Sequence, residues 1–274
     1  MDHRPDRLAG RLAVIAGQGH LPEGLATSAR QQGHEVIVFA VSGQADAAFA
    51  GFETVAIPLG AMGRTRDLLV EAGCTRMVMA GKIRRPSLSQ LKPDAAAVRI
   101  LAKVVGRGDD ALLRAIADYF AEVGIETIAP ASLMPHSVMP KGALVGALDP
   151  ELQPDIALGI AVLDALGGHD VGQSIIIQDS RVIAIEAAEG TDAMLDRVAA
   201  LLDDTGPAGI FVKCRKTGQD ARLDVPVVGD GTLRRAAAAG ISVLALQSDG
   251  VMLASPPEDL ARIAAKLNLT VVGI

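Results

Sequence analysis

The chain has 274 residues, of which half are apolar and 21% are charged. This length fits about two domains or one large one, and this composition is typical of a folded protein with a sizeable core. There are five Phe, one Tyr and no Trp, and the net charge is −6. Single-stranded nucleic acids stack on aromatic rings and duplexes need a surplus of Lys and Arg, so both counts argue against nucleic-acid binding.

The charge is divided unevenly along the chain. Residues 1–130 carry 15 basic and 14 acidic side chains, whereas residues 131–274 carry 11 basic and 18 acidic ones. An acid-rich region of this kind is either a solvated face or a source of oxygen ligands for a hard cation.

The cysteines and apolar runs indicate a cellular compartment. Cys74 and Cys214 have neither the spacing of a zinc site nor that of a disulfide framework, which suits a reducing environment. The apolar stretch Leu12–Gly17 is too short for a signal sequence, and no run approaches the roughly 18 residues of a membrane span. We therefore expect a soluble, cytoplasmic protein, and surface contact with a membrane stays open.

In the first half, apolar runs alternate with helical patterns. Strands are expected at residues 12–16, 35–41, 54–58, 76–80 and 126–129. One helix is expected to follow the first strand and to end near residue 32, and three more are expected at about 64–72, 94–105 and 109–123. Alternation at this spacing predicts crossover units and a parallel sheet with helices on both faces. We predict a Rossmann-like parallel-sheet domain over residues 1–130.

The second half has a different pattern. Prolines mark residues 131–165 as a Pro-rich linker ending in a bridging helix at 155–166. Strands are then expected at 174–178, 181–187, 209–214, 242–246 and 270–272, and helices at 191–202, 232–239 and 258–267. Asp179-Ser180 between the first two strands is a hairpin signal. The fold class predicted is α/β, with a C-terminal mixed α/β catalytic domain over residues 166–274.

A glycine turn, Gly17-Gln18-Gly19-His20-Leu21-Pro22, follows the first strand. Glycines there let the backbone approach a ligand, and the next helix presents free N–H groups to an anion. Pro22 replaces the third glycine of the dinucleotide fingerprint, and no acid ends the second strand to hold a ribose, which argues against an NAD-dependent oxidoreductase. The turn either only folds the chain or contacts a nucleotide or sugar through Gly17 and Gly19.

A basic segment, Gly81-Lys82-Ile83-Arg84-Arg85-Pro86, comes directly after the fourth strand. Ligands of open parallel sheets lie at the carboxyl ends of strands, so Gly81 and Lys82 are candidates for phosphate binding. The alternative is a solvated basic loop. The segment 92–107 adds basic residues to an apolar face, a pattern of helices that lie on lipid and, more often, of helices packed on their own core.

The acid-rich second half contains the strongest candidate for a catalytic site. It comprises Asp170-Val171-Gly172-Gln173, Glu186, Glu189-Gly190-Thr191-Asp192, and a loop with Lys213, Lys216, Gln219, Asp220, Arg222 and Asp224. Carboxylates can hold Mg²⁺ together with substrate phosphate, and lysine or arginine would bind the phosphates. This mixture predicts metal-assisted phosphoryl chemistry.

Simpler roles remain open for some of these acids. Asp192 or Thr191 can cap a helix, and Asp179 suits a turn. A nucleophilic triad has little support, because none of the five histidines lies in a recognisable catalytic or zinc motif.

At these residues the chain resembles the UDP-2,3-diacylglucosamine pyrophosphatase family of lipid A biosynthesis, the two-domain Mg²⁺-dependent type. The matching stretches are Ile15–Pro22, Ala80–Lys82, Gly108–Asp110, Asp170–Gln173, Ile185–Asp192 and Val212–Pro226. The last two are long and specific. One departure is Thr217, where a proline is expected after Lys216.

The resemblance implies hydrolysis of UDP-2,3-diacylglucosamine to 2,3-diacylglucosamine 1-phosphate (lipid X) and UMP, with the lipid bound between the two domains. It implies that Asp224 is essential, through Mg²⁺, and that water is directed at the phosphorus nearer the sugar. From the residues themselves, we expect Asp224, with Asp192 or Asp220, to hold Mg²⁺. Glu186 or Glu189 would orient water. Peripheral contact with the inner membrane and a homodimer are left open, and the alternative function is a non-catalytic nucleotide-sugar binding protein.

The remaining candidates would bind substrate. The basic side chains of Lys213, Lys216 and Arg222 would neutralise the charge that develops on the pyrophosphate. Gln173, Thr191 and Gln219 would add hydrogen bonds to the substrate.

Overall fold

The computed structural model describes residues 10–46, 49–83, 93–106, 108–203 and 206–274. The chain divides into two compact units. Unit 1 comprises residues up to Met134 together with Asp220–Asp224, and unit 2 comprises Pro135–Gln219 and Val225–Ile274. A short segment from late in the sequence therefore belongs to the N-terminal unit.

Unit 1 is built on a five-stranded parallel sheet with the order β3-β2-β1-β4-β5. Its strands are β1 (Arg11–Ala16), β2 (Val36–Val41), β3 (Glu53–Ile57), β4 (Cys74–Ala80) and β5 (Glu126–Thr127). The central strands are almost wholly apolar because both of their faces are covered by helices. The strand order changes direction between β1 and β4, which is where open α/β sheets bind ligands.

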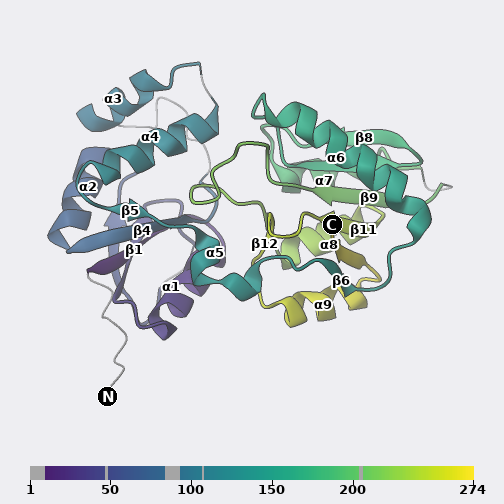
Figure 1. Cartoon of the computed structure of the whole chain (residues 1–274), viewed down its shortest axis with the longest axis horizontal. Helices are drawn as coiled ribbons and strands as arrows, with labels where there is room; N and C mark the ends of the chain where they lie inside the picture. The colour runs from purple at the N-terminus through teal and green to yellow at the C-terminus, as the bar shows by residue number, and fades with distance from the viewer. Residues whose placement is uncertain (1–9, 47–48, 84–92, 107, 204–205) are drawn as a thin grey trace. The chain divides into compact units, whose positions relative to one another are not determined.

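Five helices within the described part of unit 1 cover this sheet. They are α1 (Leu21–Gln31), α2 (Met62–Glu71), α3 (Ala95–Lys103), α4 (Asp109–Ala121) and α5 (Pro130–Leu133). Within unit 1, Figure 1 shows α1 and α5 on one side of the sheet and α2, α3 and α4 on the other. The predicted Rossmann-like parallel sheet is thus confirmed.

Unit 2 contains a six-stranded mixed sheet with the order β6-β13-β11-β9-β7-β8. Its strands are β6 (Gly142–Val145), β7 (Ser174–Gln178), β8 (Arg181–Ile185), β9 (Gly209–Lys213), β11 (Ile241–Leu246) and β13 (Thr270–Gly273). Strands β9, β11 and β13 are parallel, whereas β6, β7 and β8 each run antiparallel to a neighbour. The predicted mixed α/β architecture is confirmed.

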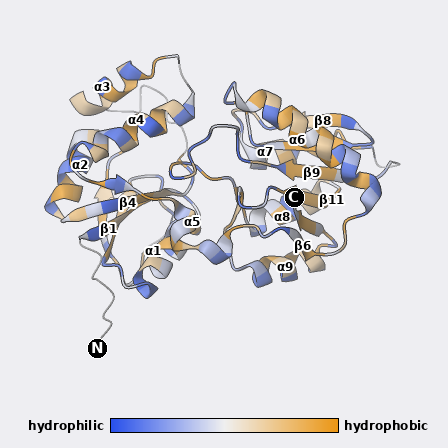
Figure 2. Cartoon of the chain, viewed as in Figure 1, coloured by the Kyte–Doolittle hydropathy of each residue, from blue (hydrophilic) through white to orange (hydrophobic). Residues whose placement is uncertain are grey.

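Alternating side chains along these strands build two cores. Ile176 and Phe211 face a core beneath helices α7 (Thr191–Val198), α8 (Asp230–Ala238) and α9 (Pro257–Lys266). Ile175 and Val212, each one position away, face a second core beneath α6 (Gln153–Gly167). Helices α7, α8 and α9 carry polar and apolar residues on different faces, whereas α6 is apolar over most of its length (Figure 2). The period of two along the strands gives each face of the sheet its own apolar side chains, and a helix layer covers each face.

The sequence missed three short strands and overextended several helices. Residues 131–165, predicted to be a linker with a bridging helix, contain α5, a 3₁₀ turn (Pro135–Ser137), β6, a second 3₁₀ turn (Pro150–Leu152) and α6. Strand β6 pairs with β13, and α6 packs on β7 and β9. The other missed strands, β10 (Val227–Val228) and β12 (Met252–Leu253), pair with each other, and Met252 also forms an isolated bridge with Val138. Strands of two to four residues are too short to produce a visible periodicity.

Candidate active site

The candidate residues fall into both units. Gly17, Gly19, Gly81, Lys82, Asp220, Arg222 and Asp224 belong to unit 1. Gln173, Glu186, Glu189, Thr191, Asp192, Lys213, Lys216 and Gln219 belong to unit 2. The chain passes from unit 2 to unit 1 between Gln219 and Asp220, so the polar loop contributes side chains to both.

The two glycine turns of unit 1 are hydrogen-bonded to each other where β1 and β4 end. Gln18 N–H donates to Lys82 O (2.9 Å), and Lys82 N–H donates to Gln18 O (3.1 Å). Neither glycine has room for a side chain, since a Cβ on Gly17 would lie 2.8 Å from Lys82 O and one on Gly81 would lie 2.6 Å from Gln18 O. Gly81 also has a φ of +88°. These glycines therefore permit a close contact between two backbone turns at the ligand-binding edge of the sheet.

Two neighbouring features affect what this edge can bind. Gly19 N–H donates to the Asp46 carboxylate (3.1 Å), so a carboxylate of the chain itself occupies one of the amides expected to face an anion. The side chain of Lys82 is exposed. Arg84 and Arg85 of the basic segment, and Lys92 and Arg107 at the two ends of the segment 92–107, lie outside the described residues.

Residues 220–224 form a turn held by the first turn of α4. Asp220 N–H lies 3.4 Å from Asp110 Oδ1, and Arg114 donates to the other oxygen of Asp110 at 2.7 Å. Buried Leu223 anchors the segment, with its N–H donating to Asp220 O (3.0 Å). Asp224, next in sequence, is exposed.

Arg222 and Asp220 form a two-pronged ion pair in this turn. Arg222 Nε lies 3.0 Å from Asp220 Oδ1, and Nη2 lies 2.7 Å from Oδ2. The hydrogen-bonded guanidinium group lowers the pKa of Asp220 to about 2, although partial burial acts in the opposite direction. Asp220 is therefore ionised throughout the neutral range.

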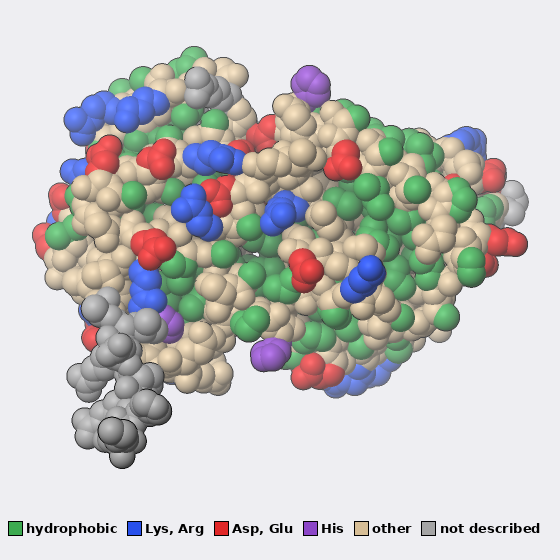
Figure 3. All heavy atoms as spheres, viewed as in Figure 1, with side chains coloured by type: hydrophobic (Ala, Val, Ile, Leu, Met, Phe, Trp, Pro, Cys, Tyr) green, Lys and Arg blue, Asp and Glu red, His purple; other side chains and the backbone are tan. Residues whose placement is uncertain are grey.

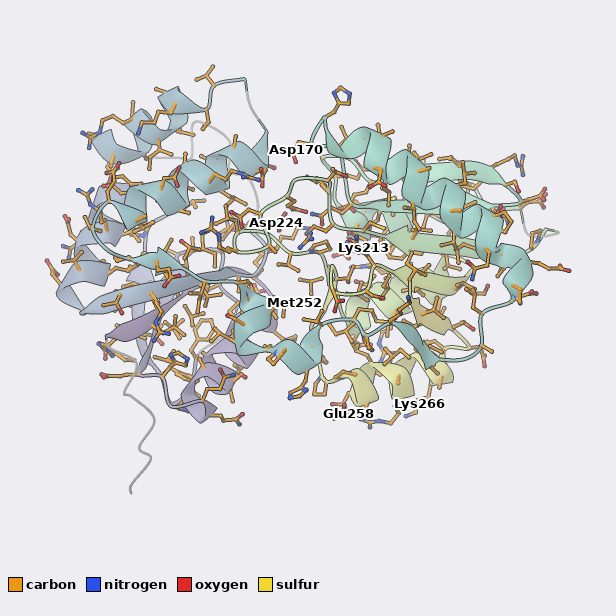
Figure 4. The ribbon with its side chains drawn as sticks, in the orientation of Figure 1. Asp170, Lys213, Asp224, Met252, Glu258 and Lys266 are labelled. Carbon is orange, nitrogen blue, oxygen red and sulfur yellow. The ribbon has the colours of Figure 1, made fainter. Side chains whose placement is uncertain are left out.

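In unit 2, Lys213 ends β9 and is 3% exposed. It is the cross-strand neighbour of Ser174, and its Nζ donates to Ser174 Oγ (3.1 Å) and to Thr191 Oγ1 at the start of α7 (2.8 Å). Glu186 Oε2 lies 3.9 Å from the ammonium group. A buried ammonium ion needs such partners, because desolvation without them is costly. Figure 4 labels the position of Lys213 in unit 2.

Glu186 lies just beyond β8, which ends at Ile185 rather than continuing to 187 as predicted. Its Oε1 accepts a hydrogen bond from the Thr191 hydroxyl (3.0 Å), and its Oε2 lies 3.4 Å from Gln173 N–H. Gly172 is confined there, since a Cβ would lie 1.9 Å from Glu186 O. The Glu186 carboxylate thus contacts both the start of α7 and the segment that leads into β7.

Two further contacts tie the polar loop to the segment before β7. Lys216 Nζ forms a salt bridge with Asp170, whose φ is +58°. Gln219 Oε1 accepts from Gln173 Nε2 (3.0 Å) and from Lys216 N–H (3.1 Å). The structure therefore brings Gln173, Lys216 and Gln219 together through direct hydrogen bonds.

Glu189 and Asp192 point to other partners. Glu189 accepts from Arg197 (3.0 Å), and hydrogen bonds from its own backbone N–H and from Arg197 lower its pKa. Asp192 lies 3.7 Å from Arg235 of α8. Among the described residues, no three His, Cys, Asp or Glu side chains form a group that could hold a metal ion.

On the face drawn in Figure 3, positive and negative side chains are interspersed in both units. No helix within the described ranges is long and apolar enough to span a membrane.

Comparison with known proteins identifies the family. The LpxI N-terminal domain matches residues 11–137, and the LpxI C-terminal domain matches residues 140–272. The chain belongs to the LpxI family. A relative in Caulobacter vibrioides, UDP-2,3-diacylglucosamine pyrophosphatase LpxI, is 34% identical, with 96% of this chain and 97% of that protein covered. A solved structure, the GalE-like L-threonine dehydrogenase from Cupriavidus necator, is 11% identical with a TM-score of 0.32, covering 94% of this chain and 72% of that one.

The structure adds residues to this candidate site that the sequence did not single out. Ser174 reads as an ordinary strand residue, yet it is fully buried and bonds Lys213. Gln247, after β11, accepts from Arg215 N–H (2.8 Å) and so holds the start of the polar loop. The only signal for either is a polar residue at the end of an apolar run, which is too common to be decisive.

Proposed function

We propose that the chain hydrolyses the pyrophosphate bond of UDP-2,3-diacylglucosamine, releasing 2,3-diacylglucosamine 1-phosphate (lipid X) and UMP. The supporting observation is the relative of that name, matched over nearly its full length and over both domains. The name describes an enzyme, so the comparison gives no support to a non-catalytic nucleotide-sugar binding protein.

In this reaction, water adds to one phosphorus atom and the bridging P–O bond breaks. Negative charge grows on the bridging oxygen and on the attacked phosphoryl group, so cationic groups accelerate the step. Lys216 and Arg222 are the cations proposed for this task. Each already holds a carboxylate of the chain, Asp170 and Asp220 respectively. Phosphate oxygens would compete with these carboxylates for the same N–H donors.

Mg²⁺ is the proposed cofactor. Protein sites for Mg²⁺ often use only one or two carboxylates, with water and substrate phosphates completing the coordination. The exposed carboxylate of Asp224 fits this requirement, and Asp192 or Asp220 would be the second ligand. The Asp220 carboxylate is ionised at neutral pH, since its pKa is about 2. When bound, the ion would neutralise phosphate charge.

The remaining candidate residues would position the substrate. We propose that Gln173 and Gln219 contact the phosphates, and that Lys213 acts by holding Thr191 at the start of α7. Glu186 or Glu189 would orient the attacking water. The paired turns at Gly17, Gly19, Gly81 and Lys82 would receive the sugar phosphate or uridine side, at the edge where parallel sheets bind ligands.

A diacylated substrate resides in a membrane, so we propose a cytoplasmic enzyme with peripheral contact to the inner membrane. Helix α3 supports this location. Val98 and, just past the helix end, Val105 are 52% and 82% exposed, beside exposed Arg99 and Lys103. Apolar and basic side chains on one surface are typical of reversible contact with anionic lipid.

The experiment that tests the proposed function is product analysis. Purified protein is incubated with UDP-2,3-diacylglucosamine, and UMP and lipid X are measured by mass spectrometry. We expect equal amounts of both products, loss of turnover in EDTA and recovery with added Mg²⁺. Absence of UMP at all Mg²⁺ concentrations would exclude the proposed reaction, and EDTA-resistant turnover would exclude the cofactor.

A further inference from the structure

The glycine turn after β1 is bordered by an acid that the sequence did not associate with it. β2 is parallel to β1 and ends at Val41, at the same edge of the sheet as the end of β1. The chain then forms a turn in which Val41 O accepts from the N–H groups of Gln44 and Ala45 (3.0 Å each). Asp46 follows this turn, and its Oδ2 accepts a hydrogen bond from Gly19 N–H (3.1 Å).

The two glycines of the turn differ in the space around them. A Cβ on Gly17 would lie 2.8 Å from Lys82 O, whereas no described atom lies within 4 Å of the position that a Gly19 Cβ would take. The Asp46 side chain is exposed, and its hydrogen bond with Gly19 uses one of its two oxygens. Because a carboxylate accepts hydrogen bonds through both oxygens, Oδ1 is left to accept from a ligand that lies beside Gly19.

This acid lies where nucleotide-binding sheets recognise ribose. The glycine turn and Asp46 are both in unit 1, at the edge where the strand order changes direction between β1 and β4. In such sheets an acid after the second strand accepts from the ribose hydroxyl groups. Residues 39–42, at the end of β2, contain no acid, but the loop that follows supplies one. Pro22 still replaces the third glycine of the dinucleotide fingerprint, so the arrangement favours a single ribose rather than a dinucleotide.

We propose that Asp46 recognises the ribose of a ribonucleotide by accepting hydrogen bonds from its 2′ and 3′ hydroxyl groups. The identity of that nucleotide, uridine, rests on the proposed function, which leaves either the sugar phosphate or the uridine side for the paired turns. The negative charge of Asp46 selects the uridine side, because it opposes a phosphate at the Gly19 amide and favours hydroxyl groups there. The exposed ammonium group of Lys82, on the adjoining turn, is then left for the phosphate attached to the ribose.

Calorimetric binding of UMP and of 2′-deoxy-UMP to the full chain tests this role directly. Wild type should bind UMP about tenfold more tightly than 2′-deoxy-UMP, which is roughly the value of one hydrogen bond. Asp46→Ala removes both oxygens, so it should bind UMP more weakly and no better than 2′-deoxy-UMP. Asp46→Asn keeps one oxygen for Gly19 N–H, so it should lose most of the preference while keeping the melting temperature of wild type.

Kinetics with the full substrate provide a second readout. Asp46→Ala should raise KM for UDP-2,3-diacylglucosamine about tenfold with little change in kcat, because a contact with the ribose is the same before and during bond cleavage. Asp67→Ala removes the same charge from an exposed position on α2 and is the matched control. It should change neither KM nor the preference for UMP.

A purely repulsive role for Asp46 gives the opposite result. If its carboxylate only keeps phosphate away from the Gly19 amide, Asp46→Ala should bind glucosamine 1-phosphate more tightly than wild type and leave the preference for UMP unchanged. That result would overturn the proposal, as would equal or unmeasurable binding of UMP and 2′-deoxy-UMP by wild type. If the wild-type chain fails to release UMP from the substrate, the proposed function fails, and the two binding measurements still decide whether Asp46 recognises ribose.

Discussion

The ammonium group of Lys213 lies 3.9 Å from the carboxylate of Glu186, and both side chains are largely removed from solvent, at 4% and 13% exposure. Ser174 and Thr191 accept the closer hydrogen bonds from the same ammonium group. This arrangement joins the end of β9, the start of β7 and the start of α7. Removing one partner of a buried ion pair leaves the other charge buried without a partner. This lowers the stability of the fold more than replacing both partners with uncharged residues would.

Lys213→Met should therefore lower the free energy of unfolding by about 3 kcal/mol, since the Glu186 carboxylate remains without its cation. Urea denaturation measures the loss. The double variant Lys213→Met with Glu186→Gln should recover part of it, because no charge is then left unpaired. Lys266→Met, at the exposed end of α9 (Figure 4), should change stability by less than about 0.5 kcal/mol. Equal losses in the two lysine variants would refute the structural role of Lys213.

The ion pair between Asp220 and Arg222 predicts a defined dependence on pH. The folded pKa of Asp220, about 2, is below its unfolded value, so the pair's contribution to stability is complete above the unfolded pKa of about 4. This contribution is lost as pH falls through about 2. Arg222→Gln should therefore lower the melting temperature at pH 7 but have a progressively smaller effect between pH 4 and pH 2.

Thermal melts across this range test the prediction. Arg234→Gln removes an equivalent charge from an exposed pair with Asp230 and is the matched control. A melting-temperature difference for Arg222→Gln that stays constant down to pH 2 would show that the pair does not lower the pKa of Asp220. Since the pKa of Asp220 is about 2, protonation of Asp220 would not account for a decrease in turnover between pH 7 and pH 5.

The paired glycine turns can be tested by comparing two glycines that share a left-handed backbone. Gly81 (φ +88°) would place a Cβ 2.6 Å from Gln18 O, whereas Gly73 (φ +70°) has open space around its Cβ position. Gly73→Ala should lower the free energy of unfolding by only about 1–2 kcal/mol, because alanine disfavours the left-handed backbone at this position. Gly81→Ala should cost more in urea denaturation and should also impair substrate hydrolysis, because it separates the two turns. Similar stability for both variants would mean that the close contact is not needed.

The sequence predicted the layers of this fold because they depend on local patterns. Alternation of Ile175, Ile176 and Ile177 between two cores follows from the period of a strand. The turn at Asp179-Ser180 adopts φ values of +51° and +56°, as a two-residue hairpin requires. The strand–helix alternation of the first half likewise corresponds to the observed parallel sheet.

Features that depend on contacts distant in sequence could not be predicted in this way. Nothing near Asp220 indicates that the turn it begins packs with the first unit, because that depends on Asp110 far earlier in the chain. Likewise, the sequence around Lys213 marks it as polar and available to substrate. In the folded chain, however, its ammonium group is hydrogen-bonded to Ser174 and Thr191, which lie in other segments of the sequence. The sequence therefore indicated which residues are candidates for the site, but it could not indicate which of them are buried and which are exposed.

The most direct test of the account concerns Asp224, the exposed carboxylate that follows buried Leu223. UMP release from UDP-2,3-diacylglucosamine is measured with wild type and Asp224→Ala in saturating Mg²⁺, together with the melting temperature of each. The account predicts a decrease in turnover of at least about a thousandfold with an unchanged melting temperature, comparable to the loss of a major electrostatic contribution to catalysis. Near-normal turnover by a folded Asp224→Ala protein would contradict it.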